Sequence, residues 1–123
     1  MEDIIENRIA ITIWGNRISP VFDVASTLLV ADIENKMIFH KTYISFDPGI
    51  PSGLVKTLKD YKISTVACGA ISNKYADLIV KNNIKLISFV TGNALNFLDN
   101  FANKYSVDKF IMDKKFIMPG CSR

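Results

Sequence analysis

The sequence predicts a single α/β domain with a mixed five-stranded sheet and helices on both faces. In the first half, apolar residues recur at every second position, which is typical of strands. After the breaker cluster Asp47-Pro48-Gly49, the apolar spacing changes to three or four, which indicates helices. The chain has 123 residues, 49% of them hydrophobic, and this suffices for one domain with its own core.

The first half predicts an antiparallel meander. Residues 8–14 alternate isoleucine with smaller residues and form the first expected strand. Residues 26–33 and 37–46 are β-rich runs, and the short polar segment 34–36 between them suits a hairpin turn.

The second half predicts helices alternating with parallel strands. Leu54, Val55, Leu58 and Tyr61 fall on one helical stripe, with Ser52 as a cap near its start. Further along we expect a strand at 64–68, a helix at 73–83 with Ser72 as N-cap, a strand at 85–90 and a last helix after 91–93. Right-handed crossovers then place the last two strands parallel in the same sheet.

Composition argues against several classes of function. The net charge of +3 is mild and the lysines are scattered, which gives little support for nucleic-acid binding. The apolar runs are shorter than the roughly 20 residues that cross a bilayer, so we expect no membrane role. The first residues are acidic and polar, unlike a secretory signal, and we expect a cytoplasmic protein.

Cys68 is the most informative single residue. It ends the run 65–68, a short buried strand followed by a glycine turn, and ligands of open α/β sheets gather at such strand ends. The thiol is therefore expected to face a binding crevice. Cys121, the other cysteine, lies on a tail that would bring a second soft ligand for a metal. Two alternatives stay open: Cys68 as a small core residue, and a disulfide, which requires an oxidising compartment.

Two strand-to-helix turns, at Gly69 and Gly92, are expected to lie side by side. Each helix start offers unpaired amide donors to an anion, so together they outline an anion-binding pocket. The loop 15–23 would emerge beside this pocket if the first and fourth strands are neighbours, and Arg17 on it would pair with an anion or be simply solvated.

The run Ser19-Pro20-Val21-Phe22-Asp23 after a first strand, the long meander and Cys68-Gly69-Ala70-Ile71-Ser72 resemble the dinitrogenase iron-molybdenum cofactor biosynthesis family, the small NifX- and NafY-like domains. The resemblance covers roughly residues 8–105. It implies a ribonuclease-H-like three-layer fold and the binding or carriage of iron-sulfur and iron-molybdenum cluster precursors.

This chain departs from the family's Ser-Pro-His-Phe-Gly pattern at two positions. Val21 stands where the histidine would be, and Asp23 replaces the glycine. The imidazole ligand is therefore missing, and thiolates of Cys68 and Cys121 would have to take its place, since soft sulfur donors suit iron-sulfur clusters.

We expect the domain to span residues 1–106 and a C-terminal arm to span 107–123. The arm repeats Lys-Phe-Ile-Met at 109–112 and 115–118. It would add a strand to its own sheet or to another copy, giving a homodimer. Alternatively, it closes over a cluster and delivers Cys121.

The sequence gives little support for a catalytic site. The first strand lacks the carboxylate that a two-metal nuclease needs. A cysteine hydrolase would need a base near Cys68, and the single histidine, His40, is expected on the face of Ile38, Thr42 and Ile44 of a distant strand. Trp14 is expected to pack at a strand end. We therefore expect a protein that is not an enzyme.

The resulting hypothesis is a carrier or scaffold for an iron-sulfur or iron-molybdenum cluster precursor, with cluster donor and acceptor proteins as partners. The expected site consists of Cys68 and Cys121 as metal ligands and Gly69, Gly92, Arg17 and Ser19 around the cluster. The alternative is a non-metal interaction or regulatory domain of the same fold, in which Cys68 is core and the arm dimerises.

Overall fold

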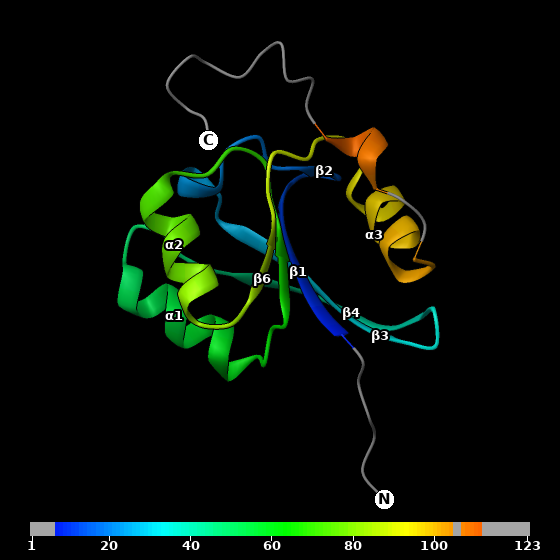
Figure 1. The fold of residues 1–123 in the computed structure, drawn as a ribbon, viewed down its shortest axis with the longest axis horizontal. Helices are drawn as coiled ribbons and strands as arrows, with labels where there is room; N and C mark the ends of the chain where they lie inside the picture. Colours follow the sequence, from blue (N-terminus) through cyan, green and yellow to red (C-terminus); the bar gives the residue numbers. More distant parts are fainter. Residues whose placement is uncertain (1–6, 105–106, 112–123) are drawn as a thin grey trace, which may run out of the picture.

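The computed structural model describes residues 7–104 and 107–111, which fold as three layers (Figure 1). Helices α1 (Pro51–Asp60) and α2 (Asn73–Lys81) lie on one side of the sheet, and α3 (Ala94–Ala102) lies on the other. The predicted mixed α/β architecture with helices on both faces is confirmed.

The sheet has six strands, one more than the sequence predicted. The strands are β1 (Asn7–Trp14), β2 (Arg17–Ile18), β3 (Thr27–Glu34), β4 (Met37–Ser45), β5 (Thr65–Ala67) and β6 (Lys85–Ile87). Their order is β4-β3-β1-β5-β6, with the two-residue β2 paired to β1. β1, β3 and β4 form the expected antiparallel meander, and β5 and β6 run parallel to β1. A strand of two residues is too short to show a period in sequence.

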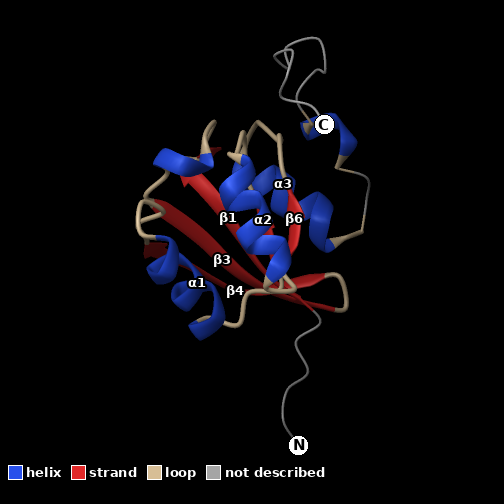
Figure 2. Ribbon diagram, turned by 60° about the vertical axis from the view of Figure 1, so that its left-hand side comes forward, coloured by secondary structure: helices blue, strands red, loops and turns tan. Residues whose placement is uncertain are grey.

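Two hydrophobic cores form, one on each face of the sheet. Ile9, Ile11 and Ile13 of β1 join the core beneath α3, which includes Phe97 and Leu98. Ala10 joins the core beneath α1 and α2, and Figure 2 shows these two helices in front of the sheet. β1 is thus buried on both faces, because it stands in the middle of the sheet with helices above and below it.

The β3–β4 hairpin is a tight, irregular ribbon. Asn35 and Lys36 at its turn have positive φ angles of 52° and 64°, as a two-residue type I′ turn requires. A β-bulge interrupts the pairing between Ala31 and Ile33. Because of the bulge, Ile38 packs against the α3-side core and Ile44 against the other core. The prediction that His40 shares one face with both isoleucines is therefore wrong, and His40 is exposed.

The helices occupy the predicted stretches with corrections at their starts. Ser52 does not cap α1, because the helix begins at Pro51 and Ile50 holds the N-cap position without a side-chain bond. In α2 the buried side chains are Tyr75 and Ile79. Among the described residues, no helix combines the length and apolar character that crossing a bilayer would require.

The described part of the expected arm packs on the domain. Val107 and Phe110 join the core beneath α3, and Phe110 lies edge-on to Phe97 with ring centroids 5.4 Å apart. Ile111 forms an antiparallel bridge with Val90. Cys121 and the rest of the arm lie outside the described residues, so the boundary at 106 and the dimerising role of the arm stay predictions.

Candidate functional site

Three loops meet at the carboxyl ends of the parallel strands. They follow β1, β5 and β6, and isolated bridges tie Val21 to Ala70 and Arg17 to Asn93. The Ile18 amide also donates to the Gly92 carbonyl at 2.9 Å. The loop after the first strand therefore lies beside both strand-to-helix turns, as the sequence predicted.

The Cys68 thiol does not face a crevice. Its residue is 0% exposed, and it lies in the core beneath α1 and α2 together with Phe22 and Val66. Burial, and to a lesser extent the nearby Asp23 carboxylate, raises the pKa of the thiol from 9.0 to about 12. The expectation of a solvent-facing thiol is wrong, because the loop after β1 folds over the end of β5. In this state Cys68 presents no thiolate to a metal.

Gly69 permits a close approach between two backbones. A Cβ at this position would stand 2.3 Å from the carbonyl oxygen of Pro20. The Ala70 amide donates to that same oxygen at 2.8 Å, and the Phe22 amide donates to the Ala70 carbonyl at 2.8 Å. The glycine therefore serves the docking of one loop on another.

Several amides around the two helix starts, where we expected an anion, donate to the protein's own groups. Ser72 holds the N-cap position of α2 as predicted, but its side chain makes no capping bond, and its own amide donates to the Asp23 carboxylate at 3.1 Å. At α3 the Asn93 side chain accepts from the Asn96 amide at 2.9 Å. The Ala94 amide donates to the Asn16 carbonyl at 3.0 Å. An anion would compete with these bonds.

The loop after β6 holds two residues in left-handed backbone conformations. Gly92 has a φ of 120°, and Phe89, which is not a glycine, has a φ of 63°. For a bulky side chain this is an uncommon conformation. It lets the chain fold back, so that the Phe89 and Val90 amides donate to the carbonyls of Gly69 and Cys68. The sequence carries no signal for Phe89 in this role.

Thr12 is a buried polar residue that sequence reasoning missed. The residue is 0% exposed, and its hydroxyl has no hydrogen-bond partner within residues 7–104 and 107–111. β1 and β5 are in parallel register with Ile11 opposite Ala67, so the next residues, Thr12 and Cys68, follow at the same level. By contrast, the buried Ser19 hydroxyl donates to the Val21 carbonyl at 3.3 Å, which makes Ser19 part of the loop's own structure. A threonine within an isoleucine-rich strand is the signal that was available.

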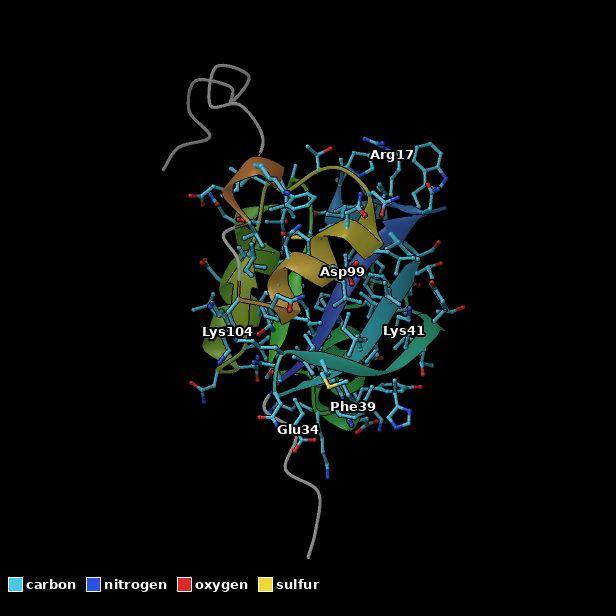
Figure 3. All side chains as sticks on the ribbon, turned by 90° about the vertical axis from the view of Figure 1, so that its right-hand side faces the viewer. Arg17, Glu34, Phe39, Lys41, Asp99 and Lys104 are labelled. Carbon is cyan, nitrogen blue, oxygen red and sulfur yellow. The ribbon has the colours of Figure 1, made fainter. Side chains whose placement is uncertain are left out.

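The accessible part of the site is its rim. Trp14 and Arg17 face each other across the β1–β2 pair, and both are exposed. Trp14 is 76% exposed, so the expectation that it packs at the strand end is wrong. Figure 3 shows Arg17 at the end of the molecule where these loops gather. The Arg17 guanidinium at this rim can bind a carboxylate or another planar anion in a bidentate way.

Metal-binding groups do not gather in the part of the chain that the structure describes. There, no three His, Cys, Asp or Glu side chains lie close enough to hold an ion. His40 lies on β4, separated from β5 by β3 and β1. The predicted pairing of Cys68 with Cys121, in a metal site or a disulfide, stays a prediction, since Cys121 is outside the described residues.

A pocket of about 440 Å³ lies at the opposite end of the sheet. Asn7, Thr65 and Lys85, at the starts of β1, β5 and β6, line it together with Phe101 and Lys104 near the end of α3. None of the predicted site residues takes part in it.

Comparison with solved structures shows the same fold in other proteins. A crystal structure described as "a putative dinitrogenase" from Methanocaldococcus jannaschii is 19% identical, with a TM-score of 0.65, and the alignment covers 82% of this chain and 92% of that one. An NMR structure described as a putative dinitrogenase from Methanococcus jannaschii is 17% identical, with a TM-score of 0.66, over 90% and 96% of the two chains.

An NMR structure described as "a putative NifB protein" from Thermotoga is 15% identical, with a TM-score of 0.62, over 78% of this chain and 87% of that one. No family model matches the sequence, and no curated protein matches it. The structural neighbours support the resemblance to NifX-like domains, and at these identities they show a shared fold.

Proposed function

We propose that this protein is a binding protein in metallocluster assembly, acting as a carrier or scaffold and not as a catalyst. The observation that carries the proposal is the meeting of the Ser19–Asp23 loop with the turn at Cys68 and Gly69. The two segments on which the sequence resemblance rests thus form one site. The fold is shared with proteins described as a putative dinitrogenase and a putative NifB protein. We extend the ribonuclease-H-like description to this fold as part of the proposal.

The buried state of Cys68 changes the ligand set that we propose. Its thiol stays protonated at neutral pH, because burial raises its pKa to about 12. Cys121 is therefore the proposed thiolate donor, and Arg17 at the rim is the proposed cation opposite a cluster or its organic acid. Cys68 would join only if the loop that covers it moved away. We place the protein in the cytoplasm, with cluster donor and acceptor proteins as its partners.

Anaerobic reconstitution with iron and sulfide tests this function. We expect a sulfur-to-iron charge-transfer absorption that Cys121→Ser abolishes and Arg17→Gln weakens. Cys68→Ala reports on the loop: an unchanged absorption means that Cys68 is core, and a lost absorption means that the loop opens. Lys81→Gln, which removes an exposed charge from the end of α2, is the matched control for Arg17→Gln.

The second candidate is a non-metal interaction or regulatory domain of the same fold. The burial of Cys68 favours it, because the thiol then has only a packing role. A wild-type protein that stays colourless after reconstitution, while folded by circular dichroism, would contradict the carrier and support this candidate.

A further inference from the structure

The outer side of β4 is an open edge of the sheet. Among the residues that the structure describes, β4 stands at the end of the strand order and pairs with β3 alone. Its nine residues are exposed or half-buried throughout. Figure 3 shows α3 lying across the sheet and leaving the β3–β4 ribbon beside it uncovered, with Lys41 and Phe39 on that ribbon. Such an edge presents backbone N–H and C=O groups to any strand that approaches.

The opposite edge of the sheet is better protected. β6 has only three residues, and the chain beyond it is paired, since Ile111 bridges Val90. The Thr91 amide also donates to the Phe110 carbonyl at 2.7 Å. Within the described residues, β4 is therefore the edge with length and access for an added strand.

The side chains of β4 resemble those of an interface more than those of a solvated strand. Met37 is 59% exposed, Phe39 53% and Tyr43 59%. Aromatic residues and methionine are enriched in protein interfaces, and an added strand would bury them through cross-strand contacts. This apolar content needs a partner that also has apolar side chains.

The charges on β4 select the kind of partner. The strand carries no acidic residue, and Lys41 stands at its centre. Within residues 7–104 and 107–111, Lys41 takes part in no ion pair. A second copy paired antiparallel about Lys41 would set one lysine opposite the other, and like charges directly opposite are destabilising. A central lysine and a bulge are the devices by which edge strands avoid pairing with themselves. An acidic strand would replace the repulsion at Lys41 with attraction.

We propose that β4 is the docking edge for an extended acidic segment of a partner protein, which adds to the sheet as one more strand. A carboxylate of the segment lies opposite Lys41, and its apolar side chains contact Phe39 and Tyr43. Backbone hydrogen bonds supply affinity that depends little on sequence, and the lysine supplies the preference for acid.

A labelled peptide of about nine residues, the length of a typical long strand, tests the proposal by fluorescence anisotropy. The peptide has glutamate at its centre and at both ends, two valines on each side of the central glutamate, and threonine at the remaining positions, so that apolar side chains lie on both faces of the added strand. We expect it to bind the full chain, to bind more weakly as salt rises, and to lose about tenfold in affinity when Lys41→Glu replaces attraction with repulsion. Lys81→Glu makes the same charge change at the end of α2, which packs beside β6, and should leave binding unchanged.

Two further peptides keep the test independent of protein variants. A peptide with lysine in place of glutamate, and one with N-methylated backbone amides, should both bind at least tenfold more weakly. Equal binding of the acidic and basic peptides, or an unchanged affinity of Lys41→Glu, would overturn the proposal. A wild-type dimer that Thr42→Pro disperses would also overturn it, since a second copy would then occupy the edge.

Discussion

Gly69 and Pro20 are in backbone contact that excludes any side chain at the glycine. A Cβ on Gly69 would stand 2.3 Å from the oxygen of Pro20 and 2.6 Å from its carbonyl carbon. The loop after β1 is thus seated directly on the turn after β5. The closed state of the site, with Cys68 beneath the loop, depends on this contact.

Gly69→Ala should destabilise the protein by about 3 kcal/mol, because the loop must move to make room for the methyl group. Urea unfolding of both proteins measures the change. Gly53→Ala is the control: its Cβ would lie 3.6 Å from the Ile50 side chain, an ordinary contact, and alanine in a helix gains about 0.5–1 kcal/mol over glycine. Equal stability of the Gly69 variant would mean that the loop is not seated as described.

Thr12→Val should raise the free energy of unfolding by about 1 kcal/mol, since it removes a buried hydroxyl that finds no partner among the described residues and keeps the shape of the side chain. Ser19→Ala is the matched comparison, because that buried hydroxyl does have an acceptor, and its removal should cost about 1 kcal/mol. A Thr12→Val variant less stable than wild type would show that a bound molecule satisfies the hydroxyl in solution.

Stability should fall at high pH because of Cys68. The pKa of its thiol rises from 9.0 to about 12 on folding, so the native state holds the proton more tightly than the unfolded chain. The contribution is complete below pH 9 and is lost between pH 9 and 12, by about 1.4 kcal/mol per pH unit. Unfolding of Cys121→Ser and of Cys121→Ser with Cys68→Ala, followed from pH 8 to 11, measures it. The two curves should converge above pH 9; parallel curves would mean that the thiol is not buried.

Asp32→Ala should cost about 1–2 kcal/mol, because it breaks a partly buried ion pair that joins β1 to β3. Arg8 donates from Nε and Nη2 to the Asp32 carboxylate, and from Nη1 to the Tyr61 carbonyl at 2.9 Å. Asp60→Ala, which breaks the exposed pair with Lys56, should leave the unfolding midpoint nearly unchanged. Similar effects of the two substitutions would contradict the structural role of Arg8.

The sequence was sufficient to predict the strands and helices in which apolar residues recur with a clear period. The isoleucines of β1 and the apolar stripes of the helices report directly which side faces a core, and they predict the meander, the parallel strands and the two helical layers. The two-residue β2 and the bulge in β3–β4 are different, because neither alters the composition of its segment. The face of His40 was therefore mistaken.

The sequence predicted where the site lies, but not that the Cys68 thiol is buried there. The strand-end rule correctly brought the loop after β1 beside Gly69 and Gly92. Whether the Cys68 thiol is exposed to solvent depends on how the loop after β1, with Pro20 and Phe22, packs over it. The periodicity of apolar residues in a sequence does not predict the packing of a loop. For the same reason the sequence placed Ser72 correctly at the N-cap of α2 but could not show that Asp23, far away in the chain, accepts from its amide.

The unequal edges of the sheet also limit the size of the assemblies that this protein can build by strand addition. With β6 short and followed by a paired segment, the part of the chain that the structure describes offers no second edge of comparable length once β4 is taken. Growth then stops after one addition, so complexes made in this way should be discrete particles of fixed stoichiometry and not open-ended fibres.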